Sequence, residues 1–246
     1  KSKSYFPYYR VNVLGTRNLV EACPKKIKRF VFISSILVNK LRNSKELVGE
    51  GYYSPPDTVY GRSKREAEEY LLELQKNIGF PVTIIRPTTV YGPREIAVQY
   101  LLFKIIKQGL FIRLGRGDNL VSYVYVKNLV KGMIQAANSS RAVGKIFNLN
   151  DRKPYEFRQF VKYIYQFSGG KMPRFYIPYP VALIGSVIYE KVVRVAGLEP
   201  IIFPSRVKTM NLNYAFSIKK AIKEFNYNPK YNLKTAVRET HDWYRR

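Results

Sequence analysis

The chain alternates between two spacings of apolar residues over its first half. Apolar positions at helical spacing predict helices, at residues 8–23, 60–77, 97–109 and 127–138. Short, continuously apolar runs between them predict buried strands, at residues 29–35, 81–87, 122–126 and 144–150. Strands that alternate with helices of about 10–15 residues are typical of a parallel sheet covered on both faces. The sequence therefore predicts an α/β fold.

The pattern changes after Asp151, where helices are separated by prolines and aromatic residues. We therefore predict two units. Residues 1–150 would form most of an α/β sheet, and residues 151–246 would form a smaller, mainly helical lobe.

The most apolar tract of the chain, residues 180–198, begins with a proline and is interrupted by Glu190 and Lys191. It therefore lacks the uninterrupted span of about 20 apolar residues that crosses a membrane. We predict a buried amphipathic helix here, and surface contact with a membrane remains compatible with the pattern.

Charge is the most pronounced feature of the composition. The chain has 43 Lys and Arg residues against 17 Asp and Glu, a net charge of +26. Such a balance attracts polyanions, including nucleic acid, acidic membranes and phosphorylated ligands. The basic residues are nevertheless spread along most of the chain, and short clusters such as "PKKIKRF" are typical of solvated helix faces. No specific nucleic-acid site is predicted.

Cysteine and histidine are too rare to build a metal site. The single cysteine, Cys23, excludes an internal disulfide and fits a reducing cytoplasm, which is the predicted location. The single histidine, His241, has no second histidine with which to hold a metal, and we assign it a surface position. No metal is predicted.

A tyrosine and a lysine stand four residues apart in "VYGRSKREAEEYLLEL", residues 59–74. On a helix this spacing puts Tyr60 and Lys64 on one face, one turn apart. A tyrosine with its ordinary pKa of about 10 needs a shift of roughly 3 units, or about 4 kcal/mol, to act as a base at neutral pH. A nearby ammonium acts in that direction. The pair therefore predicts acid–base chemistry, with ordinary helix-surface residues as the alternative.

Six segments give this pair a family context: "VNVLGTRNLVEAC", "FVFISS", "YGRSK", "IIRPTTVYGP", "SYVYVKNLVKGM" and "FNLND". Their order and spacing resemble the extended short-chain dehydrogenase/reductase family, which includes NAD-dependent epimerases/dehydratases and 3β-hydroxysteroid dehydrogenase-like enzymes. The resemblance covers nearly the whole chain. It implies a partial Rossmann-like sheet that binds NAD or NADP in residues 1–150, with residues 90–118 contributing to the substrate side, and a C-terminal substrate-binding lobe.

The resemblance also assigns roles to individual residues. Tyr60 would be the acid/base, Lys64 its electrostatic partner, Ser35 the group that orients the substrate oxygen, and Asn12 a support near the nicotinamide. Ser34 is the weaker candidate for the catalytic hydroxyl. The residues implied in cofactor binding are Asn12, Ser34, Tyr60, Lys64, Pro87, Thr88, Thr89 and Val90.

Two departures from the family pattern affect this interpretation. No GxxGxxG or GxGxxG motif opens a helix after a strand, so the glycine-rich first half of the sheet is expected to be missing, as in a fragment, a truncated product or a remnant. Relatives that act on nucleotide sugars commonly carry Asn at the position of Thr89 and Arg at that of Val121. Neither is present.

Three functional hypotheses follow. The first is an NAD(P)-dependent oxidoreductase that interconverts a secondary alcohol and a ketone, on a small-molecule substrate for which the aromatic lobe around "FYIPYPVALIG" favours a hydrophobic type. The second is a nucleotide-sugar epimerase or dehydratase, and the third a noncatalytic remnant that binds a polyanion or a partner. Because the family often dimerises through its two long helices, residues 8–23 and 60–77 are the predicted homodimer interface.

Overall fold

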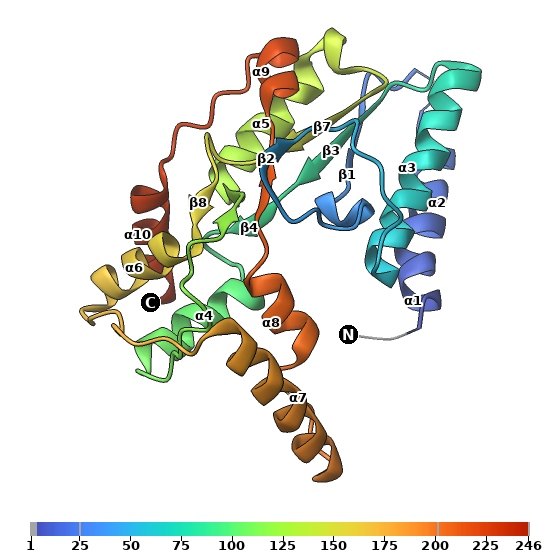
Figure 1. Ribbon diagram of the computed structural model, residues 1–246. Coiled ribbons are helices and arrows are strands. Elements are labelled where there is room, and N and C mark those ends of the chain that lie inside the picture. The colour runs from blue at the N-terminus through green and yellow to red at the C-terminus, as the bar shows by residue number, and fades with distance from the viewer. Residues whose placement is uncertain (1–3, 25, 201, 246) are drawn as a thin grey trace.

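The computed structural model describes residues 4–24, 26–200 and 202–245 (Figure 1). Its central sheet has three parallel strands in the order β1–β3–β7, namely β1 (Phe30–Ile33), β3 (Val82–Pro87) and β7 (Lys145–Leu149). Ile33 lies opposite Ile85, and Pro87 lies opposite Leu149, so the three strands end at a common edge. The predicted fold class, α/β with a partial Rossmann-like parallel sheet, is confirmed.

Helices cover both faces of this sheet. Alternate strand residues point to opposite sides, and because both sets are mainly apolar in β3, both faces are buried. Ile84 packs with Leu71 of α3 (Val59–Ile78), and its neighbour Ile85 packs on the other face with Leu129 of α5 (Val126–Asn138). A further helix, α9 (Lys219–Phe225), lies against β7 on the α5 side. Each face of the sheet therefore carries its own hydrophobic core.

The predicted first helix is a continuous helical stretch with a wider turn in its middle. It consists of α1 (Phe6–Tyr9), the π-helical turn η1 (Arg10–Leu14) and α2 (Gly15–Glu21). This stretch packs along α3, and Figure 1 shows the two side by side at the edge of the molecule. A π turn inside an α-helix is frequently found at a functional site.

Two smaller sheets lie beyond the carboxyl ends of the central strands. In one, β4 (Thr89–Tyr91) pairs in parallel with β6 (Tyr123–Tyr125). The other has the order β2–β9–β5–β8, formed by β2 (Ser44–Val48), β9 (Tyr214–Phe216), β5 (Leu120–Val121) and β8 (Tyr155–Glu156). Because β9 pairs with β2 and β5, and α9 packs on β7, the C-terminal segment returns to the first half of the fold. The domain boundary at residue 150 stays a prediction.

The C-terminal lobe is mainly helical. It contains α6 (Phe157–Ser168), α7 (Tyr179–Val195), α8 (Pro204–Met210) and α10 (Leu233–Tyr244), and α4 (Val98–Lys107) packs against α6. Its core is aromatic, and the rings of Tyr123 and Phe160 stack with centroids 4.5 Å apart. His241 is buried in α10, close to Phe167, so the predicted surface position of this histidine is wrong.

The apolar tract at residues 180–198 is the helix α7, as predicted, but its predicted burial is wrong. Only Ala182 and Ser186 are buried in it. The helix contacts α8, and it extends away from the body of the molecule (Figure 1). No helix within the described residues is long and apolar enough to cross a membrane.

Candidate active site

The carboxyl ends of β1 and β3 bring the predicted serine and threonine residues together. The Ser34 amide donates to the carbonyl of Ile85 at 2.7 Å, which fixes the end of β1 beside the end of β3. The hydroxyls of Ser34 and Thr88 are both buried, and neither has a hydrogen-bond partner among the described residues. Because a buried polar group is normally satisfied, two orphan hydroxyls at one sheet edge indicate a place for a polar ligand.

Tyr60 lies in the first turn of α3, and local contacts fix the position of this turn. The Thr58 side chain caps the helix by accepting from the Gly61 amide at 3.0 Å. The helix also passes very close to the loop after β1, because a Cβ added at Gly61 would lie 2.0 Å from the carbonyl oxygen of Leu37. Only glycine permits this approach. This close contact places the Tyr60 phenol near the end of β1.

The Ser35 hydroxyl lies beside the Tyr60 phenol, close enough to influence its pKa. Partial burial raises the pKa of Tyr60, and the Ser35 hydroxyl acts in the opposite direction. The sequence had predicted a lowered pKa. In the protein alone desolvation outweighs the stabilisation of the phenolate, so the shift has the other sign.

Lys64 lies one turn further along α3, and its ammonium is fixed against β1. Its Nζ donates to the carbonyl of Ile33 at 2.9 Å and lies 4.8 Å from the centroid of the Phe32 ring. Burial lowers the pKa of Lys64, while the nearby charge of Glu68 acts to raise it. A lysine held this way presents a constrained positive charge beside the strand end.

Asn12 lies in the π-helical turn and reaches Tyr60 through an intermediate residue. Its Nδ2 donates to Ser63 Oγ at 2.9 Å, and Ser63 Oγ donates to the carbonyl of Tyr60 at 2.8 Å. The ring of Tyr8 meets that of Tyr60 edge-on, with centroids 6.1 Å apart. Ser63 is not among the predicted residues, although its place directly before Lys64 on the same helix could have indicated it.

The structure brings Asn12, Ser35, Tyr60 and Lys64 to one edge of the central sheet, but it separates part of the predicted cofactor set. Thr89 and Val90 belong to β4, which leads into the smaller sheets. The Thr89 side chain lies beside Tyr214 and acts to lower the pKa of its hydroxyl, against the rise caused by burial. Pro87, the last residue of β3, and Thr88, which follows it, are the part of the "RPTTV" segment at the end of the central sheet.

Val121 is buried in β5, within the aromatic core of the lobe. An arginine there would have to leave this core to reach a phosphate. A separate pocket of about 540 Å³ contains none of the proposed catalytic residues. Its lining has four cationic side chains, Lys45, Arg113, Arg116 and Arg158, and two acidic ones, Asp118 and Glu156. Among the described residues there is no group of three or more His, Cys, Asp or Glu that could hold a metal ion.

A family model described as the NAD dependent epimerase/dehydratase family matches residues 2–149. The chain belongs to this family. The resemblance found in the sequence is thereby confirmed, and the family's description makes NAD its cofactor.

Two curated relatives differ in the chemistry that their names describe. The N-acetyl-alpha-D-glucosaminyl-diphospho-ditrans,octacis-undecaprenol 4-epimerase of Escherichia coli O157:H7 is 33% identical over 204 residues, 82% of this chain and 61% of the relative. The sterol-4-alpha-carboxylate 3-dehydrogenase, decarboxylating, of Bos taurus is 30% identical over 250 residues, 95% of this chain and 69% of the relative. The chain thus spans about three fifths of the first relative's length.

The solved structure of UDP-glucuronic acid 4-epimerase from Bacillus cereus in complex with NAD shares the fold. It matches 100% of this chain and 71% of its own chain, with a TM-score of 0.76 and 21% identity. This similarity concerns the fold, and it agrees with the sheet and lobe described above.

Proposed function

We propose that the protein is an NAD(P)-dependent oxidoreductase that interconverts a secondary alcohol and a ketone. The observation that carries this proposal is the placement of Ser35 beside Tyr60 at the end of β1, with Lys64 Nζ held 2.9 Å from the Ile33 carbonyl. A hydroxyl beside a phenol at a sheet edge can hydrogen-bond one substrate oxygen from two sides. Lys64, fixed on Ile33 nearby, supplies the positive charge that a phenolate needs.

The residues around this edge fit the nicotinamide end of a dinucleotide. The orphan hydroxyls of Ser34 and Thr88 would satisfy polar groups of the cofactor. Pro87, the chain neighbour of Thr88, would contact it as well. When bound, NAD(P) would supply the hydride acceptor for oxidation or the hydride donor for reduction. The positive charge of its oxidised form would oppose the raised pKa of Tyr60.

The chain's own residues handle the proton. In oxidation Tyr60 Oη takes the proton of the substrate hydroxyl, and in reduction it returns a proton to the carbonyl oxygen. Ser35 Oγ hydrogen-bonds the same oxygen and holds it in register. The line from Asn12 through Ser63 to the Tyr60 carbonyl fixes the helix turn that carries the phenol.

The test replaces Tyr60 by Phe in the natural protein. Turnover of secondary alcohols, followed by NAD(P)H absorbance, should fall by a factor of about 10²–10⁴, the usual contribution of a general acid or base. Cofactor binding, measured by fluorescence titration, should be unchanged. Tyr53→Phe, at a tyrosine that is 71% exposed, is the matched control. Undiminished turnover in Tyr60→Phe would remove the proposal.

A nucleotide-sugar epimerase or dehydratase is the second candidate, because the names of a curated relative and of a solved structure describe epimerases. It would use the same four residues. The buried Val121 and the engaged Thr89 favour the oxidoreductase over it. Turnover of a UDP- or dTDP-linked sugar without net change in NAD(P)H would identify the epimerase.

A noncatalytic role is the third candidate, supported by the net charge of +26 and by the cationic pocket. The grouping of Ser35, Tyr60 and Lys64 at one edge of the sheet argues against a noncatalytic role. Salt-sensitive retention on nucleic acid together with no dinucleotide binding would support it. The cytoplasmic location stays a prediction.

A homodimer through the paired long helices is also part of the proposal. The outer side of the first helical stretch exposes Phe6, Val11 and Leu19, which are 62%, 74% and 63% exposed. An apolar, helical surface of this kind suits a second copy of the same helices. Light scattering of Val11→Glu against the unchanged protein tests this interface, because the charge should lower the mass to that of a monomer.

A further inference from the structure

Helix α7 carries a continuous apolar stripe on its outer side. The stripe residues follow helical spacing and are 57%, 63%, 58%, 63% and 90% exposed, in the order Val181, Ile184, Ile188, Val192 and Val195. The buried residues Ala182 and Ser186 lie on the opposite side, against the body. The stripe is therefore a formed surface that faces away from the protein's own core.

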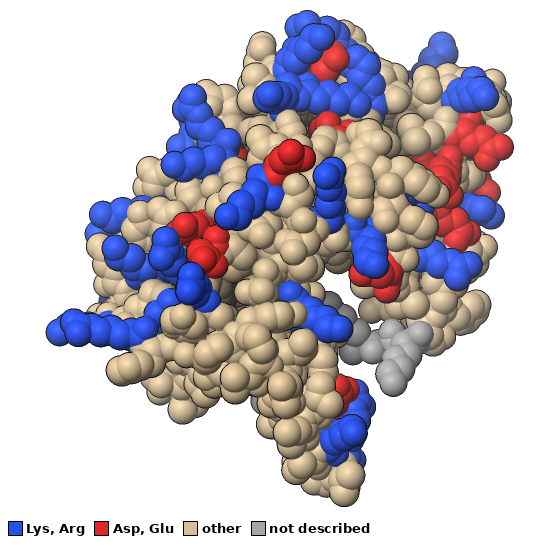
Figure 2. Space-filling view, in the orientation of Figure 1, with Lys and Arg blue, Asp and Glu red and all other residues tan. Residues whose placement is uncertain are grey.

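Five aligned apolar side chains on one protruding helix are unusual, because scattered exposed apolar residues need no explanation but contiguous ones do. Figure 1 shows α7 extending beyond α8 and α4, clear of the other elements. In Figure 2 the same projection is mostly uncharged, with a few charged side chains on one flank. Two further apolar residues near its ends, Phe175 and Leu198, are 90% and 65% exposed.

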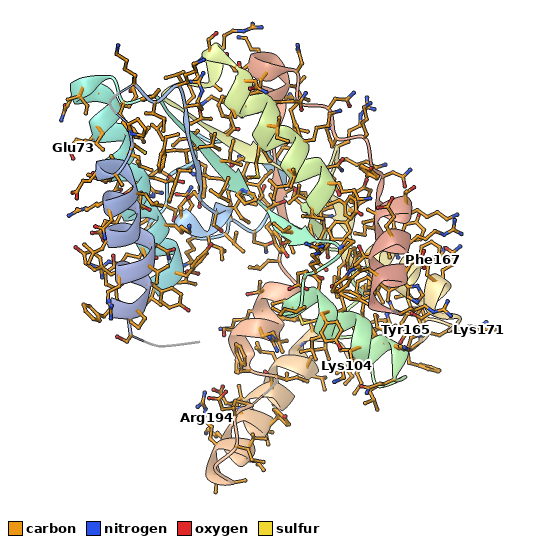
Figure 3. All side chains as sticks on the ribbon, turned by 180° about the vertical axis from the view of Figure 1, so that it is seen from behind. Glu73, Lys104, Tyr165, Phe167, Lys171 and Arg194 are labelled. Carbon is orange, nitrogen blue, oxygen red and sulfur yellow. The ribbon has the colours of Figure 1, made fainter. Side chains whose placement is uncertain are left out.

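One flank of the stripe carries the charged residues of α7. Helical spacing places Lys191 directly beside the stripe, and Arg194, labelled on the projection in Figure 3, pairs with Glu190 at 2.7 Å. From Lys171 to Lys208 the sequence has six Lys or Arg residues against two glutamates. Long basic side chains beside an apolar surface can bury their stems and keep their charges in water.

These features fit one kind of occupant. We propose that α7 docks on an anionic lipid membrane, lying in the interface with its stripe among the acyl chains and the lysine and arginine of one flank at the headgroups. A helix with one apolar face and cationic edges binds a bilayer in this orientation. A second copy of the chain is the weaker fit, because it brings the same net charge of +26, whereas an anionic surface complements that charge.

Docking through α7 would also orient the rest of the molecule. In Figure 1, α7 and α8 lie on the side toward which the carboxyl ends of the central strands point. The edge that carries Ser35 and Tyr60 would then face the lipid rather than the bulk solvent. This docking does not depend on the proposed reaction, and Tyr60→Phe should bind vesicles as the unchanged protein does.

Vesicle co-sedimentation tests the proposal. The natural protein should pellet with vesicles of phosphatidylcholine and phosphatidylglycerol, much less with phosphatidylcholine alone, and the binding should weaken as salt is raised. Ile188→Asp/Val192→Asp should lower the affinity for the mixed vesicles at least tenfold. Because both side chains are exposed, the variant should keep the circular dichroism spectrum and Tm of the unchanged protein.

The matched control is Val130→Asp/Ile134→Asp on α5, where the two residues are 46% and 57% exposed and also border lysines. It should leave vesicle binding unchanged. Equal loss in both double variants, no binding by the natural protein, or binding that ignores lipid charge would each overturn the proposal. So would α7 variants that convert a dimer to a monomer in light scattering but still pellet with the vesicles, since the stripe would then cover a second copy.

Discussion

The guanidinium of Arg86 bonds both carboxylate oxygens of Glu68 inside the protein, with Nε–Oε1 at 2.9 Å and Nη2–Oε2 at 2.5 Å. Both residues are almost fully buried. Glu68 follows Lys64 by one turn of α3, and Arg86 precedes Pro87 at the end of β3. The ion pair thus joins the helix that carries the proposed acid/base to the strand that ends at the proposed cofactor residues.

Breaking this pair from one side should destabilise the protein strongly. Glu68→Gln leaves a buried guanidinium without its counter-charge, which typically costs about 3–5 kcal/mol. Urea unfolding measures the loss. Glu190→Gln, in the exposed pair with Arg194 on α7, is the control and should cost less than about 1 kcal/mol.

Replacing both partners together separates the pair's net contribution from the cost of an orphan charge. Glu68→Leu/Arg86→Met should be more stable than Glu68→Gln alone, because no buried charge is left unpaired. A double variant as unstable as the single one would mean that the packing at this site, and not the ion pair, is what matters.

The close packing of Gly61 leads to a prediction about the first turn of α3. A methyl group at this position would collide with the Leu37 carbonyl, 2.0 Å away, and a backbone oxygen cannot rotate aside. Gly61→Ala should therefore cost about 1–3 kcal/mol or more, the usual range for overpacking. It should also lower turnover, because the turn that holds Tyr60 must move.

The control for Gly61 is another helical glycine with free space around it. Nothing lies within 4 Å of a Cβ at Gly185, in α7. Gly185→Ala should stabilise the protein by about 0.5–1 kcal/mol, because alanine is the better helix former. Equal losses in the two variants would show that close approach to Leu37 is not the cause.

The sequence predicted the parts of the fold that have a regular pattern. The strands β1, β3 and β7 are continuous apolar runs because both of their faces are covered, and Tyr60 and Lys64 share a face because helical spacing requires it. The short strands β2 and β9 carry no such pattern. They pair with each other across the fold, and only the folded chain brings Ser44 opposite Tyr214.

Burial was the property that sequence reasoning judged least well. The apolar tract of α7 was expected inside and lies outside, whereas His241 was expected outside and lies inside. Composition shows how apolar a segment is, but its burial depends on which other elements pack against it in the folded chain. The link from Asn12 to Ser63 was missed for the same reason, because it joins two helices whose contact the sequence does not encode locally.

Asp151 gives a prediction about pH. This carboxylate is buried just after β7 and accepts hydrogen bonds from the Tyr125 amide, from Asn128 Nδ2 and from the Tyr91 hydroxyl. Burial raises its pKa from 3.8 to about 6, and these hydrogen bonds limit the rise. Folding therefore favours the protonated form. The stability that this residue contributes is fully present below about pH 4 and is lost as the pH rises through about 6.

The rise in the pKa of Asp151 from 3.8 to about 6 corresponds to a change in unfolding free energy of about 3 kcal/mol. Asp151→Asn has no titrating group at this position. Between acidic and neutral pH, the unfolding free energy of the natural protein should therefore fall by about 3 kcal/mol relative to that of the variant. Urea unfolding over a pH series measures this difference. Parallel curves would mean that Asp151 titrates normally.

Lys64 provides the sharpest test of the proposed acid–base pair. Burial raises the pKa of Tyr60, so oxidation, which needs the phenolate, should accelerate as the pH rises. Lys64→Met removes a positive charge one helical turn from the phenol. It should move the rise in kcat/KM to higher pH by about one unit or more, because the phenolate loses an electrostatic partner.

A purely structural role for Lys64 would give a different result. Losing the bond from Nζ to the Ile33 carbonyl alone should lower kcat/KM at every pH without moving the profile. Lys64→Arg, which keeps the charge, should keep the position of the profile even if its height falls. Lys76→Met, at the exposed end of α3, removes an equal charge far along the helix and should change neither. A shift of the pH profile in Lys64→Met alone therefore assigns the effect to the charge beside Tyr60, whereas a profile lowered without a shift assigns it to the support of β1.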